Sequence, residues 1–160
     1  PFDDEDVMEG QGTIALEIME ELPDVDYILV PIGGGGLISG IACAAKQINP
    51  SVKIVGVEPE GAASALAAVE DDQLVKLSEV STIADGTAVK QIGETPFEYI
   101  KKYVDEIVTV SDYELMEALT TPDHPDNEAV RAWVESMGYH FYDADAVNHA
   151  LRDYHESLKK

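Results

Sequence analysis

Four consecutive glycines, Gly33-Gly34-Gly35-Gly36, are the residues whose type and spacing point most clearly to chemistry. They separate a short apolar run, residues 27–32, from a segment with apolar residues at helical spacing, residues 37–48. Glycine lets the backbone approach a ligand closely and adopt positive φ. A strand, such a loop and a helix bring consecutive N–H groups and a helix N-terminus to one point, which suits a doubly charged phosphate. The pattern predicts a site for a small phosphorylated ligand.

The loop departs from two common nucleotide-binding patterns. It contains no lysine, so it is not a P-loop of the usual kind, and Ile38 stands where G-x-G-x-x-G requires its third glycine. A phosphate site therefore competes with a simpler interpretation, in which the glycines form a tight strand-to-helix turn that holds no ligand. The sequence leaves both interpretations open.

The rest of the chain alternates between helical spacing and short apolar runs. Helices are predicted over residues 11–22, 37–48, 62–69, 96–103 and 111–119. Strands are predicted over residues 27–32, 52–57 and 107–110, and the first is expected to be buried on both faces. Residues 71–95 have the composition of a long loop that could contain one short strand. The alternation predicts a three-layer α/β/α, Rossmann-like fold with a mainly parallel sheet of about four to five strands.

Residue usage changes near position 120. Residues 1–119 contain no Arg, His or Trp, whereas residues 120–160 contain both arginines, all four histidines and Trp133. We expect one α/β domain over residues 1–160, with a tail that adds a helix, a strand and a final helix. The change favours a junction between two sources, as in a chimera or an engineered protein, over chance clustering. Asp145, His149 and Asp153 share a helix face in the tail, but solvated side chains are favoured there over a metal site.

The charge balance excludes several kinds of partner. Acidic residues number 32 against 10 basic ones, for a formal net charge of −22. Such a polyanion is repelled by nucleic acid and by anionic membranes, so neither is an expected partner. The single cysteine, Cys43, excludes an internal disulfide. With no signal-peptide pattern, it favours a cytoplasmic protein. A start without Met suggests a processed, excised or engineered chain.

Residues 30–40 resemble the phosphate-binding loop of fold-type-II pyridoxal-phosphate enzymes, and more narrowly that of threonine ammonia-lyase (threonine dehydratase) and the related serine racemases. Further segments agree with that family in the same order: Phe2-Asp3-Asp4 with residues 10–17, Val57-Glu58-Pro59, residues 82–90 and residues 107–112. The resemblance covers about residues 1–119 and leaves residues 120–160 without a family.

The resemblance implies pyridoxal phosphate as cofactor. It assigns the phosphate to Gly33, Gly34, Gly35, Gly36 and Leu37, and it places Gly86 near the cofactor ring. It also makes Glu58 and the carbonyl of Ala62 two ligands of a divalent cation that some relatives hold. Ser64 stands where that site needs a third, acidic ligand, which weakens the cation prediction, and Glu60 is only a weak substitute. The alternative for Glu58 is a solvated carboxylate after a strand.

The resemblance also implies a catalytic lysine that this sequence does not match. In the family, the Schiff-base lysine lies in a Ser-x-Lys-x-Arg-Gly type motif, and none of the eight lysines here is in such a motif. No catalytic residue is assigned, and the chain alone is expected to bind the cofactor non-covalently without turnover. Two alternatives remain: a scaffold with no ligand, and an amino-acid lyase that needs a lysine-bearing part from elsewhere. A homo-oligomer is also open, since relatives often form dimers or tetramers.

Overall fold

The computed structural model describes residues 2–121, in two units that divide after Val110. The first unit contains helices, strands and two short 3-10 turns. Its helices and strands are α1 (Glu5–Glu21), β1 (Tyr27–Pro31), α2 (Gly36–Ile48), β2 (Lys53–Pro59), α3 (Ser64–Glu70), α4 (Glu94–Tyr103) and β3 (Glu106–Val110). The 3-10 turns are Glu60–Ala62 and Asp85–Thr87. In the second unit, α5 (Asp112–Thr120) is described, and its capping box between Ser111 and Glu114 confirms the predicted helix start.

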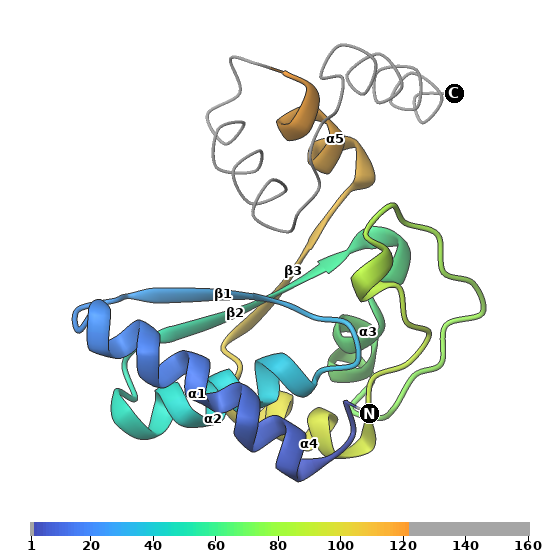
Figure 1. Cartoon of the computed structure of the whole chain (residues 1–160). Helices are drawn as coiled ribbons and strands as arrows, with labels where there is room; N and C mark the ends of the chain where they lie inside the picture. Colours follow the sequence, from blue (N-terminus) through green and yellow to red (C-terminus); the bar gives the residue numbers. More distant parts are fainter. Residues whose placement is uncertain (1, 122–160) are drawn as a thin grey trace. The chain divides into compact units, whose positions relative to one another are not determined.

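The three strands form a parallel sheet in the order β1-β2-β3 (Figure 1). The register pairs Leu29 with Val55, and Val55 with Glu106. Each connection between neighbouring strands contains at least one helix, as parallel pairing requires. The α/β class and the parallel sheet are therefore confirmed, with three strands present in the described residues.

All four helices of the first unit pack on one face of this sheet. The buried core joins Ile28 and Ile54 of the strands to Ala15 of α1, Ile41 of α2 and Phe97 of α4, and α3 adds Ala65 and Ala68. Figure 1 shows α1, α2 and α4 together on one side of β1 and β2. The other face of β1 is open: Tyr27 is 62% exposed and Leu29 is 64% exposed.

This arrangement differs from the expected burial of residues 27–32 on both faces. Burial in β1 alternates along the strand, because in residues 2–110 helices cover a single side of the sheet. The second helical layer of the predicted three-layer fold stays a prediction. The helix, strand and final helix predicted for the tail, with Asp145, His149 and Asp153, lie outside the described residues.

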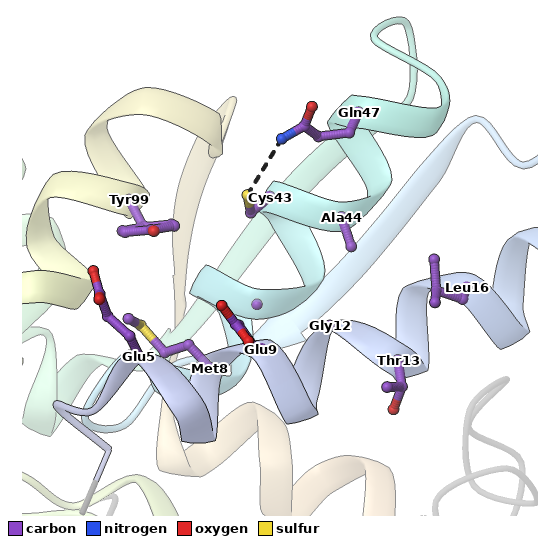
Figure 2. Close-up of a pocket in the computed structure, with 11 residues that line it drawn as sticks. Glu5, Met8, Glu9, Gly12, Thr13, Leu16, Cys43, Ala44, Gln47 and Tyr99 are labelled. Carbon is purple, nitrogen blue, oxygen red and sulfur yellow. Dashed lines mark hydrogen bonds between the residues drawn. The ribbon is translucent and has the colours of Figure 1, made fainter.

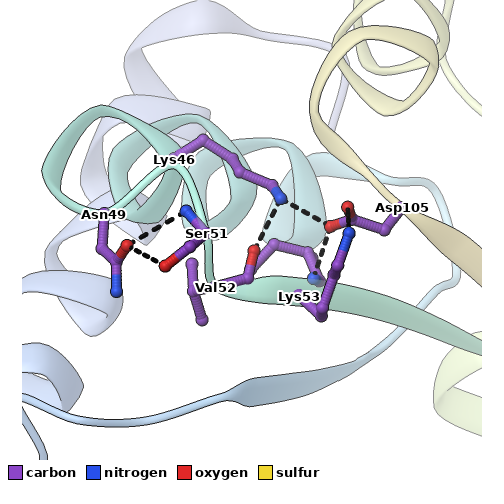
Figure 3. Close-up of polar contacts among 7 residues, drawn as sticks. Lys46, Asn49, Ser51, Val52, Lys53 and Asp105 are labelled. Carbon is purple, nitrogen blue, oxygen red and sulfur yellow. Dashed lines mark hydrogen bonds and ion pairs between the residues drawn. The ribbon is translucent and has the colours of Figure 1, made fainter.

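An ion-pair cluster fixes the end of the sheet where β2 begins (Figure 3). The carboxylate of Asp105 lies 2.6 Å from Nζ of Lys46, on α2, and 2.9 Å from Nζ of Lys53, at the start of β2. It also accepts a hydrogen bond from the N–H of Ile54 at 2.8 Å. Partial burial alone would raise the pKa of Asp105, but these three donors lower it to about 2. The cluster lies at the opposite end of the strands from the glycine loop.

No helix in the part of the chain described here combines the length and the apolar character that crossing a membrane would need. The long loop predicted over residues 71–95 is confirmed for residues 71–93, which contain one 3-10 turn and no strand. This loop returns the chain to the carboxyl end of the sheet, where it contacts the glycines.

Candidate functional site

The glycine loop lies at the carboxyl end of β1, directly before α2, as the sequence predicts. Gly35 is the N-cap of α2 and has a φ of +93°. This left-handed conformation disfavours any residue with a Cβ. A Cβ at Gly35 would also lie 2.7 Å from the Cβ of Pro96, at the start of α4. Glycine is required here by the backbone and by packing together.

The loop presents N–H groups that the described residues leave without an acceptor. No backbone hydrogen bond within residues 2–121 is donated by the N–H groups of Gly33 to Leu37, and Gly35 brings no side chain to cap them. Gly33, Gly34 and Leu37 are half-buried, close to the surface. The helix dipole of α2 adds partial positive charge at the same point. Several N–H donors without an acceptor in the described residues therefore lie at a helix N-terminus, and such a loop fits a phosphate group.

The turn at Asp85–Thr87 lies directly beside the loop. A Cβ at Gly33 would lie 3.2 Å from Cα of Thr87 and 3.3 Å from the carbonyl oxygen of Gly86. Gly86 itself faces open space, since a Cβ there would meet no atom within 4 Å. The structure thus brings Gly86 next to Gly33 of the predicted loop, 53 positions away in the sequence. The roles of these residues toward a cofactor remain a prediction.

Two further residues lie at the site, Phe2 against the loop and Asp3 against the start of α4, and neither was predicted as a site residue. The ring of Phe2 packs directly on Gly34, so that a Cβ at Gly34 would overlap it. Asp3 accepts hydrogen bonds from the N–H groups of Glu94 and Thr95, both at 3.0 Å. Their partners lie more than 30 and 90 positions away, so no local pattern signals these contacts.

The predicted cation ligand Glu58 has a different role in the structure. Its side chain is fully buried, so the alternative of a solvated carboxylate is wrong. Oε1 accepts a hydrogen bond from the N–H of Ala65 at 2.9 Å, and Oε2 accepts one from Leu66 at 2.8 Å. Burial raises the pKa of Glu58, and these hydrogen bonds offset part of the rise. The carboxylate caps α3, whose own N-cap residue, Ala63, has no polar side chain.

As arranged, these residues do not fit a divalent cation. Both oxygens of Glu58 are engaged by amides, and Ser64 contributes no charge at the position of the third ligand. The Oγ atom of Ser64 is buried, with no hydrogen-bond partner in the described residues. The carbonyl of Ala62 alone does not make a site for a hard cation, which takes six or more oxygen ligands. Elsewhere in residues 2–121, no group of three His, Cys, Asp or Glu side chains is placed to hold a metal ion.

A separate cavity of about 350 Å³ opens beside α1 and α2 (Figure 2). Its lining includes Met8, Leu16, Cys43 and Tyr99, with acidic side chains from the first turns of α1. None of the four loop glycines lines it. The cavity is therefore distinct from the glycine loop.

The fold and the loop together define an α/β protein with a glycine turn that fits an anion at the carboxyl end of a parallel sheet. The chain belongs to the family of pyridoxal-phosphate dependent enzymes, whose model matches residues 1–121. This family match confirms the resemblance predicted from the sequence and pyridoxal phosphate as the cofactor.

Curated relatives narrow the comparison. The chain is 50% identical to an L-threonine ammonia-lyase of Thermotoga maritima over 119 residues, which cover 74% of this chain and 30% of that protein. It is 44% identical to the catabolic L-threonine dehydratase TdcB of Escherichia coli over 119 residues, which cover 74% of this chain and 36% of that protein. The chain therefore spans about a third of the length of these relatives.

Solved structures agree with these relatives. The processed form of threonine deaminase isoform 2 from Solanum lycopersicum matches with a TM-score of 0.73 and 46% identity, covering 74% of this chain and 35% of that one. Maize serine racemase matches with a TM-score of 0.68 and 40% identity, covering 70% of this chain and 35% of that one.

Proposed function

We propose that residues 2–110 are the part of a threonine ammonia-lyase-like enzyme that binds the phosphate of pyridoxal phosphate. The observation that carries this proposal is the set of N–H groups from Gly33 to Leu37, at the start of α2, that have no acceptor within residues 2–121. Relatives named threonine ammonia-lyase and threonine dehydratase support it, because they match the stretch that contains the loop. The substrate would then be a hydroxy amino acid.

The residues of this chain would bind and orient the cofactor. The N–H groups of Gly33 to Leu37 would hold its phosphate, and the backbone at Gly86 would limit the space beside it. Pyridoxal phosphate supplies an electron sink for eliminations from amino acids when it is bound. Gly35 keeps the loop in the left-handed conformation that its backbone has directly before α2. None of these residues is proposed to transfer a proton.

We expect no turnover of threonine by this chain alone, because four of the six described lysines are held by carboxylates or by a backbone carbonyl. Lys46 and Lys53 pair with Asp105 at the other end of the sheet, and Lys101 pairs with Asp72. Nζ of Lys90 donates to the carbonyl of Ser78 at 3.0 Å. The pKa of Lys53 and of Lys101 is raised, first by hydrogen bonds to those carboxylates, whereas a nucleophilic lysine needs a lowered pKa. Activity would require a lysine-bearing part in addition to these residues.

A scaffold without a ligand is the second candidate, and packing favours it. A Cβ at Gly36 would lie 2.7 Å from the carbonyl oxygen of Phe2, and Gly34 and Gly35 are also confined by neighbours. Contacts within the protein therefore account for three of the four glycines without any phosphate. They do not account for the N–H groups that lack acceptors, and ligand binding distinguishes the two candidates.

The origin of the tail belongs to the same proposal. The family match ends at residue 121, next to the change of residue usage at position 120. This coincidence supports different origins for residues 1–119 and 120–160. A tail from another source would explain why the family resemblance stops there.

Thermal unfolding in the presence of a phosphate ester tests the proposal. Pyridoxine 5′-phosphate is the preferred probe, because it lacks the aldehyde that reacts with surface lysines. At 100 times its dissociation constant, a ligand adds about 2.7 kcal/mol to the free energy of unfolding, a rise in Tm of roughly 5–10 °C. We expect this shift with the phosphate ester and none with pyridoxine. A chain that shows no shift at any concentration of the ester is a scaffold.

A further inference from the structure

Phe2 and Asp3, which we call the N-terminal strap, join the glycine loop to the start of α4, and Phe2 lies directly on the loop. The ring of Phe2 occupies the space that a side chain at Gly34 would need. The carbonyl oxygen of Phe2 lies 2.7 Å from where a Cβ at Gly36 would be. The strap thus covers two of the four glycines and leaves no room for the loop to move toward it.

Asp3 fastens the strap to α4. Oδ2 of Asp3 accepts a hydrogen bond from the N–H of Glu94 and Oδ1 accepts one from Thr95, each at 3.0 Å. The N-cap residue of α4 is Gly93, which has no side chain to satisfy these amides. Asp3 therefore acts as the helix cap from 91 positions away. The hydrogen bond from Glu94 is the largest cause that lowers the pKa of Asp3.

The start of α4 is in turn joined to the glycine loop. The N–H of Gly93 donates to the carbonyl of Gly34 at 3.0 Å. Pro96 blocks the side-chain position of Gly35, and Oγ of Ser39 donates to the carbonyl of Gly35 at 2.7 Å. The strap, the start of α4 and the glycine loop therefore each contact the other two.

We infer that Phe2 and Asp3 are positioning residues that hold the loop N–H groups in the arrangement that binds phosphate. This inference rests on the proposed function, because it concerns the same site. Neither residue donates to the ligand itself. They act through Gly34 and Gly93, whose carbonyl and N–H determine how the loop is oriented against α4.

Asp4 provides a matched control for Asp3. Its Oδ1 accepts a hydrogen bond from the N–H of Asp6 at 3.0 Å and caps α1. Asp3→Ala and Asp4→Ala each remove one carboxylate and one helix cap at neighbouring positions. Removing a negative charge should by itself strengthen the binding of an anion, equally in both variants. If Asp3 positions the loop, Asp3→Ala should instead weaken anion binding, whereas Asp4→Ala should not.

The test is the dissociation constant of pyridoxine 5′-phosphate, measured by calorimetry at a temperature where circular dichroism shows every variant folded. We expect Asp3→Ala to bind roughly fivefold more weakly, the factor expected from losing a typical cap. Asp4→Ala should match the native chain or bind slightly more tightly. Phe2→Ala should weaken binding in the same direction as Asp3→Ala, since it frees the loop on the strap side.

Asn is also a good helix cap, so Asp3→Asn serves if Asp3→Ala does not fold. A weaker affinity for Asp3→Asn than for the native chain supports the inference, because the side-chain amide can accept from only one of the two N–H groups. Equal affinities for Asp3→Ala, Asp4→Ala and the native chain overturn the inference and leave the proposed function standing. A native chain that does not bind the ester overturns both.

Discussion

Oε1 of Glu58, at the end of β2, accepts a hydrogen bond from the N–H of Ala65, in α3, at 2.9 Å inside a fully buried site. Oε2 accepts a second hydrogen bond, from Leu66. The carboxylate thereby attaches α3 to the carboxyl end of the sheet, next to the strand that precedes the glycine loop. A residue that the family resemblance assigns to a cation serves here as a helix cap.

Replacing this cap should destabilise the protein. In Glu58→Gln, the side-chain NH2 must face one of the two N–H groups that the carboxylate now accepts from. We expect the free energy of unfolding at pH 5 to fall by about 1–3 kcal/mol, measured by urea denaturation. Glu60→Gln, at an exposed neighbour, should change it by less than about 0.5 kcal/mol. Equal effects at the two positions would contradict the capping role.

The same variant predicts a pH dependence. Burial raises the pKa of Glu58 above 4.5, so the native state keeps this proton to higher pH than the unfolded state. The stability from this group is complete below the unfolded pKa and is lost as pH rises through the native value. The difference in stability between the native chain and Glu58→Gln should therefore shrink from pH 4.5 to pH 7.5. A difference that grows with pH would show that the charged carboxylate is the stabilised form.

Divalent cations should not stabilise the protein through Glu58. At a net charge of −22, Mg²⁺ and Ca²⁺ screen repulsion in any variant, so the native chain and Glu58→Gln should show the same rise in Tm. The measurement is a thermal titration of both proteins against each chloride, with an EDTA-treated reference. A saturable rise in the native chain that disappears in Glu58→Gln would reveal a cation site.

Two glycines should respond in opposite ways to the same substitution. A Cβ at Gly40 would overlap the carbonyl oxygen of Met8 and lie 2.8 Å from N of Gly12, where α1 and α2 pack backbone to backbone. Gly40→Ala should lower the free energy of unfolding by about 1–3 kcal/mol. Gly10→Ala should raise it by about 0.4–1 kcal/mol, because nothing lies within 4 Å and α1 is helical there. Urea denaturation of both variants tests the close approach of α1 to α2. An unchanged free energy of unfolding in Gly40→Ala would contradict that close approach.

Asp105 should govern part of the acid stability. Its pKa is lowered from 3.8 to about 2, so its contribution of about 2 kcal/mol is present above pH 4 and is lost as pH falls toward 2. Asp105→Asn should lose this amount at pH 7 and show a flatter stability profile between pH 4 and 2. Asp72→Asn is the control, since the Asp72 side chain is 81% exposed and its pair with Lys101 should contribute less than about 1 kcal/mol. A native profile as flat as that of Asp105→Asn would contradict the role of the cluster.

Local patterns predicted most of the elements in residues 2–121. The strands at 27–31, 53–59 and 106–110 stand out as apolar runs between turns, and α2 follows the glycines as expected. The start of α1, residues 5–10, was missed, because Gly10 and several acidic residues obscure its helical spacing. That stretch packs against α2 through the backbone of Met8 at Gly40, a contact that no periodicity reveals. The open face of β1 was also missed, since an apolar run cannot tell how many helical layers cover it.

The candidate site, like the fold, was predicted only in part from the sequence. The glycine loop and Gly86 were predicted as site residues, because glycine marks a turn at each position. The structure brings them together. The strap and the cap at Glu58 were not predicted as such, since each depends on a partner from another element. A carboxylate that caps a distant helix has the same local sequence as one that is solvated or bound to a metal. Only the folded arrangement distinguishes these roles.

The most direct test of the central claim is to observe the loop amides themselves. In a ¹⁵N-labelled chain, titration with pyridoxine 5′-phosphate should shift the N–H resonances of Gly33 to Leu37 and of Gly86 in a saturable manner, and pyridoxine should not. Saturation without movement of the loop resonances, or no response to the ester at all, would contradict the assignment of this loop as the phosphate site.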